Sequence, residues 1–229
     1  MPRCIHSTLH RPQWPVSRMP SRFFITGTDT SVGKTVVSAL LCAALDAIYW
    51  KPIQTGTREG TDRETVRKLA QLPPARTRPE SYRFAPPVSP HLAARRAGVR
   101  IELRKIEMPG IAPAECLIAE GAGGVLVPIN ETQMMTHLMN HLKLPVLLVC
   151  RTSLGTINHT LLSLAVLRAA RLRVQGVVMV GKQNDENRKA IEHYSEAQVI
   201  GTVPILPSID RAALRRVFRK NFDRKVFEP

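Results

Sequence analysis

The chain has 229 residues, 44% of them hydrophobic and 22% charged, which is the composition of a soluble protein with one buried α/β core. Its apolar runs fall well short of the ~18 residues of a membrane-spanning helix, which excludes such a helix. The formal net charge of +15 raises nucleic acid as a partner, but much of the excess lies in the first 20 and last 19 residues. A basic groove built into the fold would concentrate charge in the middle, so no specific nucleic-acid partner is expected.

The cysteines and the N-terminal segment bear on where the protein works. Cys42, Cys116 and Cys150 lie in apolar segments, and no CxxC or Cys/His spacing typical of a metal site occurs. Buried thiols in a reducing compartment, the cytoplasm, are therefore expected. Residues 1–20 lack the apolar core of a secretory signal, and we expect an extension that is disordered or upstream of the functional start.

From residue 22 onward, strand and helix patterns alternate. A strand is predicted over 23–26, a helix over 34–46, a strand over 48–51 and a polar helix over 62–71. Residues 72–90 contain six prolines, too many for regular structure, and are predicted to be loop.

The second half of the chain repeats this alternation. Nearly continuous apolar runs at 116–119, 146–150 and 174–180 are typical of inner parallel strands. Further helices are predicted over 132–142, 157–170 and 185–197, and a last strand over 199–203. The pattern predicts an α/β domain over 21–210, a doubly wound and mainly parallel sheet with helices on both faces, followed by a basic tail over 211–229.

A glycine-rich segment, GTDTSVGKT at 27–35, connects the first strand to the first helix. Backbone N–H groups and the helix N-terminus offer donors to phosphate oxygens, Lys34 adds a compact positive charge, and the Thr35 hydroxyl can ligate Mg²⁺. The spacing departs from GxxxxGK[ST], but the position after a strand and before an apolar helix is that of a P-loop. Phosphate groups of a ligand are expected at Thr30, Ser31, Val32, Gly33, Lys34, Thr35 and Val36.

This segment resembles the phosphate-binding loop of dethiobiotin synthetases, whose pattern is GTDTxVGKT. Three further blocks, KPIQTG at 51–56, EGAGG at 120–124 and LGTINH at 154–159, are similar to that family's KPxxxG, EGAGG and LGxxNH and come in the same order. The resemblance spans about 22–207. It implies a homodimeric, ATP- and Mg²⁺-dependent cyclo-ligase of biotin biosynthesis. Such an enzyme converts 7,8-diaminopelargonate and CO₂ to dethiobiotin, ADP and phosphate through a carbamate and a carbamic-phosphoric anhydride.

Two lysines and two carboxylates carry the expected chemistry. Lys51, at the end of the second strand, would project toward the γ-phosphate and, with Lys34, stabilise charge in the transition state; a lysine at a strand end is otherwise a solvated charge. Carboxylates are good Mg²⁺ ligands, and the resemblance implies that Asp62 and Glu120 ligate the metal together with Thr35. For Asp62, at the start of a predicted helix, an N-cap is the alternative. Its match to the family is also looser than that of Glu120, because the stretch from Lys51 to Asp62 is short for the family.

Substrate and base contacts follow from the remaining blocks. Glycine lets the backbone approach a ligand closely, although a tight strand-to-loop turn is the alternative for Gly121 to Gly124. The resemblance implies that Gly121, Ala122 and Gly123 lie in a loop between nucleotide and substrate. The resemblance implies that the substrate is held by Thr55, Gly123, Gly155, Asn158 and Tyr194. The segment containing Gly155 and Asn158, with Tyr194, would hold the carboxylate end, partly from a neighbouring subunit; a helix cap is the alternative for Asn158. Ser89, Pro90 and His91 are expected near the pocket wall.

The expected base site departs from the family. Where the family has Asn after the late strand, this chain has Val180-Gly181. The base would then be held by Val180, Gly181, Pro204, Ile205 and Leu206, with more use of backbone groups, and the strictness of the preference for ATP stays open.

A second hypothesis is a P-loop switch ATPase of the partitioning or positioning type, which has a related loop and often a basic surface. Such ATPases usually carry a further lysine near the loop start, where this chain has Thr28 and Asp29. An amidating ligase on the same scaffold is a third possibility, although no glutaminase domain is evident. The four ordered blocks favour the cyclo-ligase.

Overall fold

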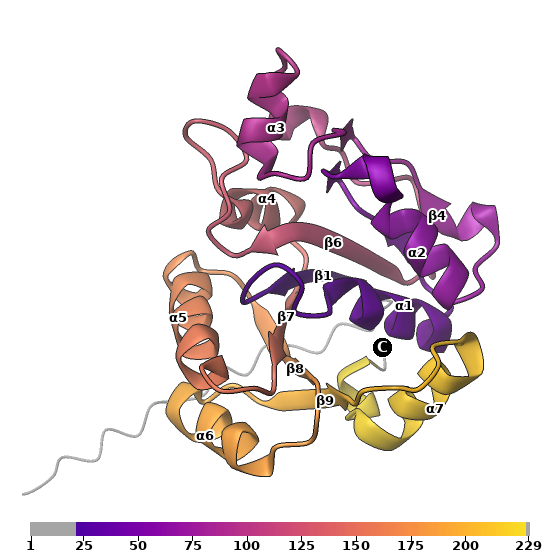
Figure 1. Cartoon of the computed structure of the whole chain (residues 1–229), viewed down its shortest axis with the longest axis vertical. Coiled ribbons are helices and arrows are strands. Elements are labelled where there is room, and N and C mark those ends of the chain that lie inside the picture. The colour runs from indigo at the N-terminus through magenta and orange to yellow at the C-terminus, as the bar shows by residue number, and fades with distance from the viewer. Residues whose placement is uncertain (1–21, 228–229) are drawn as a thin grey trace, which may run out of the picture.

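The computed structural model describes residues 22–227 and places a seven-stranded parallel sheet at the centre of the molecule (Figure 1). In sheet order the strands are β4 (Thr77–Arg78), β2 (Ile48–Trp50), β6 (Leu117–Gly124), β1 (Arg22–Gly27), β7 (Val146–Arg151), β8 (Val174–Val180) and β9 (Val199–Val203). Two further strands, β3 (Ile53–Gln54) and β5 (Tyr82–Arg83), pair in a small second sheet.

Helices cover both faces of the central sheet. The helices are α1 (Lys34–Leu45), α2 (Asp62–Leu69), α3 (Pro90–Arg96), α4 (Met135–Leu142), α5 (Thr156–Ala169), α6 (Asp185–Ser195) and α7 (Arg211–Asn221). Buried side chains of α1, α2 and α7 belong to one apolar cluster, and those of α3, α4, α5 and α6 belong to another. In Figure 1, α5 and α6 lie on the left and α1 and α7 on the right. The expected doubly wound architecture is confirmed.

Strand β1 shows why the apolar runs are continuous. Phe23 and Ile25 point into one cluster, and Phe24 points into the other. A strand buried on both faces needs apolar residues at every position. The runs expected to be inner strands accordingly form β6, β7 and β8, each between two neighbours.

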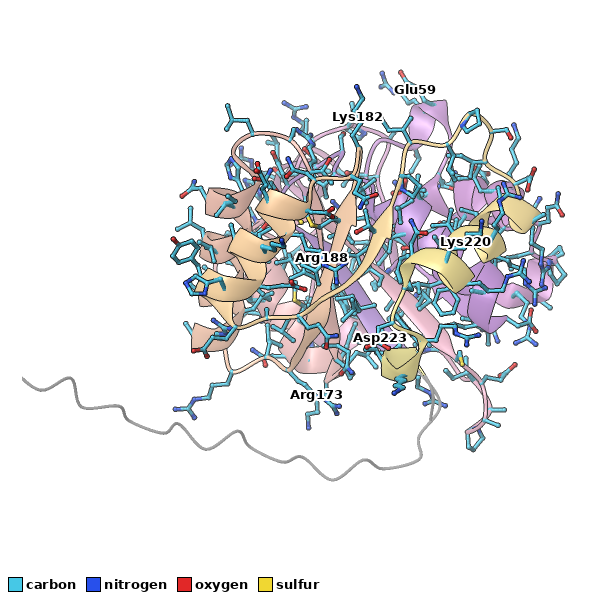
Figure 2. The ribbon with its side chains drawn as sticks, turned by 90° about the horizontal axis from the view of Figure 1, so that it is seen from below. Glu59, Arg173, Lys182, Arg188, Lys220 and Asp223 are labelled. Atoms are coloured by element: carbon cyan, nitrogen blue, oxygen red, sulfur yellow. The ribbon has the colours of Figure 1, made fainter. Side chains whose placement is uncertain are left out.

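The carboxyl ends of the parallel strands share one edge of the sheet, where ligands bind in such folds. In Figure 2, Lys182, which follows β8, projects at this edge together with Glu59, whereas Arg173, which precedes β8, lies at the opposite edge. The loop between β1 and α1 also follows the carboxyl end of a strand.

The structure differs from the predicted strands, helices and loops at residues 72–90 and 121–124. Residues 72–90 are not loop throughout, because β4 and β5 form there and α3 starts at Pro90. The segment expected as a loop at 121–124 is the end of β6, where Gly124 pairs with Gly27. Glu120, which directly follows the strand predicted over 116–119, therefore lies within β6.

The basic segment after residue 210 also differs from the expected tail. It forms α7 and a short 3-10 helix at Arg224–Phe227. Leu214, Val217 and Phe218 are buried in the same cluster as α1. The folded domain therefore continues to the end of the described residues.

Other expectations concern the thiols, the membrane and the N-terminal segment. Cys42 and Cys150 are buried, and Cys116 is partly buried. Within residues 22–227, the helices are too short or too polar to span a bilayer. The extension expected at 1–20, including Cys4, lies outside the described residues.

Candidate active site

Two cationic side chains, Lys34 and Arg151, donate hydrogen bonds to backbone carbonyl oxygens of the phosphate-binding loop. Lys34 Nζ donates to the carbonyl oxygen of Asp29 at 2.7 Å, and the Arg151 guanidinium donates to the carbonyl oxygen of Thr30 at 3.3 Å. Gly33 is the N-cap of α1, with φ of 99°, a conformation that favours glycine. Burial lowers the pKa of Lys34 from 10.5 to about 8, even though the Glu120 carboxylate opposes this shift.

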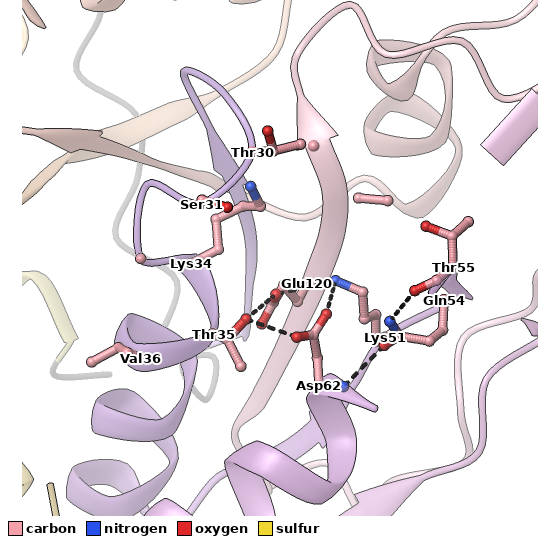
Figure 3. A pocket seen from close by; sticks show the side chains of 13 residues that line it. Thr30, Ser31, Lys34, Thr35, Val36, Lys51, Gln54, Thr55, Asp62 and Glu120 are labelled. Carbon is pink, nitrogen blue, oxygen red and sulfur yellow. Dashed lines mark hydrogen bonds and ion pairs between the residues drawn. The ribbon is translucent and has the colours of Figure 1, made fainter. Parts of the chain in front are cut away.

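Beside this loop, four polar side chains from different elements converge (Figure 3). Lys51 Nζ lies 2.7 Å from Asp62 Oδ2 and 3.1 Å from Glu120 Oε1. The Thr35 hydroxyl lies 3.1 Å from Asp62 Oδ1 and 3.0 Å from Glu120 Oε1. The structure thus brings together the expected catalytic lysine and all three expected metal ligands.

The charges in this cluster stabilise one another. Burial opposes the ammonium of Lys51, but the carboxylates of Glu120 and Asp62 together raise its pKa. Burial likewise opposes the charge of Asp62, but Lys51 and a hydrogen bond from Thr35 hold the pKa of that carboxyl below its usual value. A lysine with two carboxylate partners is not the solvated strand-end charge of the alternative interpretation.

The donor set fits a hard divalent cation. Asp62, Glu120 and Thr35 present oxygen atoms next to a phosphate-binding loop, and Mg²⁺ is commonly held by one or two carboxylates plus phosphate oxygens. Within residues 22–227, no three His, Cys, Asp or Glu side chains are grouped so that they could hold a metal by themselves. Since Lys51 Nζ already lies between the two carboxylates, this position suits positive charge.

Asp62 is placed by the start of α2 but does not cap it. The N-cap is Thr61, whose hydroxyl accepts from the backbone N–H of Glu64, while the Glu64 carboxylate accepts from the N–H of Thr61. This capping box leaves the Asp62 side chain, at the first helical position, turned toward Thr35 and Lys51. The alternative of an N-cap role for Asp62 is wrong.

Two adjoining cavities share Asp62 of this cluster, and the other three residues of the cluster line the first cavity. The first, of about 380 Å³, is lined by Thr30, Ser31, Gly33, Lys34, Thr35, Val36, Lys51, Gln54, Thr55, Asp62, Glu120, Ala122 and Gly123. The second, of about 590 Å³, shares part of this wall, including Thr55, Asp62 and Gly123, and adds Ser89 and Pro90. His91 stands behind this wall, with Nδ1 3.1 Å from the Ser89 hydroxyl oxygen. The first cavity is thus lined by the phosphate loop, and the second offers room for a second ligand.

The residues expected to contact the base are only partly brought together. Val180, Gly181 and Ile205 line a third cavity, of about 540 Å³, with Arg151, Thr152, Ser153, Lys182, Gln183 and Asn184. Pro204 lines a different cavity, and Leu206 packs against the core. Nearer the phosphate loop, Val32 is in the core, and Gly121 contributes its carbonyl oxygen, which accepts from Lys51 Nζ.

Three expected substrate residues lie away from these three cavities. Gly155 is the N-cap of α5 and is not assisted by a side chain, so the alternative of Asn158 as the cap is wrong. Asn158 is exposed, and Tyr194 is 70% exposed at the end of α6. In this chain alone, they do not meet the phosphate loop.

Several site residues were not predicted. Ser38 and Tyr49 contact Glu120, Gln54 accepts from the N–H of Asp62 through its side-chain oxygen, and Arg151 holds the loop. Ser38 has a sequence signal, because it follows Thr35 by three positions and shares its helix face. Tyr49 has none, because its apolar strand gives no indication of where its hydroxyl points.

Comparisons with known proteins support this fold. A family model described as an AAA domain matches residues 21–213. A ParA family ATPase from Chlorobium tepidum is 12% identical, with a TM-score of 0.51 and coverage of 89% of this chain and 92% of that chain. A chain of the MinC:MinD cell division protein complex of Aquifex aeolicus is 16% identical in sequence, with a TM-score of 0.50 and coverage of 86% of this chain and 85% of that chain. Fold and site define the chain as a P-loop nucleotide-binding protein.

Curated relatives narrow this class to one family. The ATP-dependent dethiobiotin synthetases BioD of Brucella melitensis and Brucella ovis are each 44% identical over 204 residues, which cover 89% of this chain and 95% of the relative. The chain belongs to the ATP-dependent dethiobiotin synthetase family, and it is therefore an enzyme, a ligase of biotin biosynthesis. This membership favours the ligase over the switch ATPase, since the likeness to ParA and MinD proteins shows the fold alone.

Proposed function

We propose that this chain converts 7,8-diaminopelargonate and CO₂ to dethiobiotin, with ATP consumed to ADP and phosphate. The observation that carries the proposal is the cluster of Lys51, Asp62, Glu120 and Thr35 at the meeting point of two cavities. The phosphate loop lines one cavity, and the other cavity has the size of a small-molecule site. A phosphoryl group and an acceptor can thus meet at the lysines.

The reaction needs positioning and charge stabilisation rather than a protein nucleophile. One substrate amine adds to CO₂ and loses a proton, which gives a carbamate. A carbamate oxygen attacks the γ-phosphorus as the bond to ADP breaks, and a carbamic-phosphoric anhydride results. The second amine attacks the carbonyl carbon, loses a proton and closes the cyclic urea as phosphate leaves.

The residues of the cluster have separable roles. Lys34 and Lys51 would stabilise the negative charge that develops on the transferred phosphoryl group. Thr35, Asp62 and Glu120 would hold Mg²⁺, which neutralises phosphate charge when bound. Thr55 and Gly123, which line both cavities, would contact the substrate near the reacting amines.

We assign the base to the cavity beside Val180 and Gly181. The cavity adjoins the phosphate loop, because Arg151 lines it and donates to Thr30 in that loop. Gln183 and Asn184 line it as well, and their amides offer donors and acceptors that could substitute for the asparagine of the family. Pro204 and Leu206 would then support Ile205 rather than touch the base.

A second copy of the chain would complete the substrate site. Three large hydrophobic side chains are exposed: Leu154 just before α5, Leu162 on α5 and Tyr194 on α6. Gly155 and Asn158 lie at the start of α5, close in sequence to Leu154. A homodimer through this face would cover them and bring Gly155, Asn158 and Tyr194 toward the partner's cavity. Sedimentation should show a dimer that Leu162→Asp separates, with ADP affinity retained and diamine affinity lost. The buried thiols of Cys42 and Cys150 would suit the cytoplasm, where thiols are kept reduced.

Phosphate release from MgATP, with and without the diamine plus bicarbonate, tests the function directly. We expect release to require the diamine and mass spectrometry to detect dethiobiotin. Hydrolysis indifferent to the diamine would reject the substrate, and stimulation by DNA instead would return the switch ATPase to consideration.

A further inference from the structure

The carboxylate of Glu120 is held from two sides by four donors. On one side, Oε2 accepts from Ser38 Oγ at 2.7 Å and from the Tyr49 hydroxyl at 3.0 Å. On the other side, Oε1 lies 3.0 Å from the Thr35 hydroxyl and 3.1 Å from Lys51 Nζ. The side chain is 1% exposed, so this carboxylate is fixed by protein groups.

The two sides of the carboxylate face different surroundings. Ser38 and Tyr49 are completely buried and come from α1 and β2. Thr35 and Lys51 line the cavity at the phosphate loop. One carboxylate oxygen is therefore held toward the interior, and the other is presented beside the cavity.

The hydroxyl of Tyr49 contributes more than packing requires. Tyr49 lies in β2, in the cluster that also holds Ile118 and Val66, where a phenylalanine ring would fill the same space. A buried phenol needs a hydrogen-bond partner, and here that partner is Glu120. Ser38 supplies the second hydroxyl from one turn beyond Thr35 on α1. Both donors to Glu120 Oε2 therefore come from regular secondary structure, a helix and a strand.

We propose that Ser38 and Tyr49 are positioning residues that lock Glu120, so that Oε1 alone is offered to the divalent cation. This inference rests on the metal site of the proposed function. Mg²⁺ requires near-ideal octahedral geometry, and a carboxylate that cannot rotate presents one oxygen in a fixed direction. Groups behind a metal ligand commonly contribute about 10–100-fold to metal affinity.

The test measures metal binding without turnover. Mn²⁺ is titrated into the full-length protein saturated with ADP, and free Mn²⁺ is followed by electron paramagnetic resonance for wild type, Tyr49→Phe, Ser38→Ala and the double variant. We expect the dissociation constant for Mn²⁺ to rise about tenfold in each single variant and further in the double variant. ADP affinity without metal should stay within about twofold, since neither residue lines the phosphate-loop cavity.

Tyr82→Phe is the matched control, because the Tyr82 hydroxyl accepts from the backbone N–H of Glu102, away from the metal ligands. It should leave Mn²⁺ affinity unchanged. Unchanged Mn²⁺ affinity in both Tyr49→Phe and Ser38→Ala would overturn the proposal, as would an equal loss of metal-free ADP affinity, which would indicate general damage to the loop. If wild type itself shows no ADP-dependent Mn²⁺ site, the metal site of the proposed function fails as well.

Discussion

The role that we propose for Lys51 in catalysis is coupled to a role in stability, because Lys51 is the buried cation between Asp62 and Glu120. We expect Lys51→Ala to fold and bind nucleotide but to lose turnover by about 10²–10³-fold, as on removal of one preorganised transition-state donor. The free energy of unfolding should fall by about 3 kcal/mol, because two carboxylates lose their partner. Phosphate release and urea unfolding measure the two effects. Lys68→Ala, an exposed lysine of α2, should change neither, and near-normal turnover of Lys51→Ala would remove the assigned role.

The lowered pKa of Lys34 leads us to expect that nucleotide binding depends on pH. Its pKa of about 8 lies below the ordinary value, so the ammonium is charged below pH 8 and neutral above it. Only the charged form attracts phosphate, and the affinity for ADP should therefore fall by about tenfold between pH 7 and pH 9, as the charged fraction does. Calorimetric titration at several pH values measures this decline. Lys34→Arg stays charged throughout and should give a flat profile; a flat profile in wild type would contradict the assignment.

At the scale of elements, the capping box of α2 sets the position of Asp62. Thr61→Ala removes the hydroxyl that caps the N–H of Glu64 and should lower the free energy of unfolding by about 1 kcal/mol. Because Asp62 is the next residue, we also expect a higher Mg²⁺ concentration for half-maximal phosphate release. Thr61→Ser keeps the cap and should restore both values. A Thr61→Ala variant with unchanged Mg²⁺ dependence would separate the cap from the metal site.

An element can be predicted from the sequence when its residues leave a clear local pattern, and it is missed when prolines or glycines interrupt that pattern. The loop at 27–35 and the inner strands were predictable, because phosphate binding and burial on both faces each leave a strong local pattern. Strand β4 and helix α3 were missed, because prolines surround β4 and Pro90 opens α3, where proline is tolerated at the first turn. The glycines after Glu120 favoured a loop, but their small size lets β6 continue close to β1, with Gly124 opposite Gly27.

The candidate site shows a similar division. The motifs predicted Thr35, Lys51 and Glu120, because the segments at 27–35, 51–56 and 120–124 each contain one of them. Asp62 lies outside the motifs and was expected only from the resemblance to the family. The motifs did not predict the contact between Tyr49 and Glu120, which depends on how β2 packs against β6. Hydrogen bonds between distant elements leave no periodic pattern in the sequence, so side-chain partners of this kind required the structure.

For the molecule as a whole, the C-terminal segment shows how charge can obscure an amphipathic pattern. Seven Lys/Arg residues among the last 19 suggested a tail, yet Leu214, Val217 and Phe218 have the i, i+3, i+4 spacing of a buried helix face. Their cationic neighbours Arg215, Arg216 and Arg219 are exposed. The net charge therefore belongs to the outer surface of a helix whose inner face closes the domain.

This arrangement predicts that α7 stabilises the fold without taking part in the chemistry. The Phe218 ring lies 5.3 Å from that of Phe227 and 5.4 Å from that of Phe222, measured between centroids, so Phe218→Ala should lower the free energy of unfolding by about 3–4 kcal/mol. At a temperature where the variant stays folded, its kcat should equal that of wild type, because α7 contributes no residue to the phosphate-loop cavity. Arg219→Ala, the exposed neighbour, should shift stability by less than about 0.5 kcal/mol. Urea unfolding that finds Phe218→Ala as stable as wild type would show that the segment after residue 210 is an appendage, as its charge first suggested.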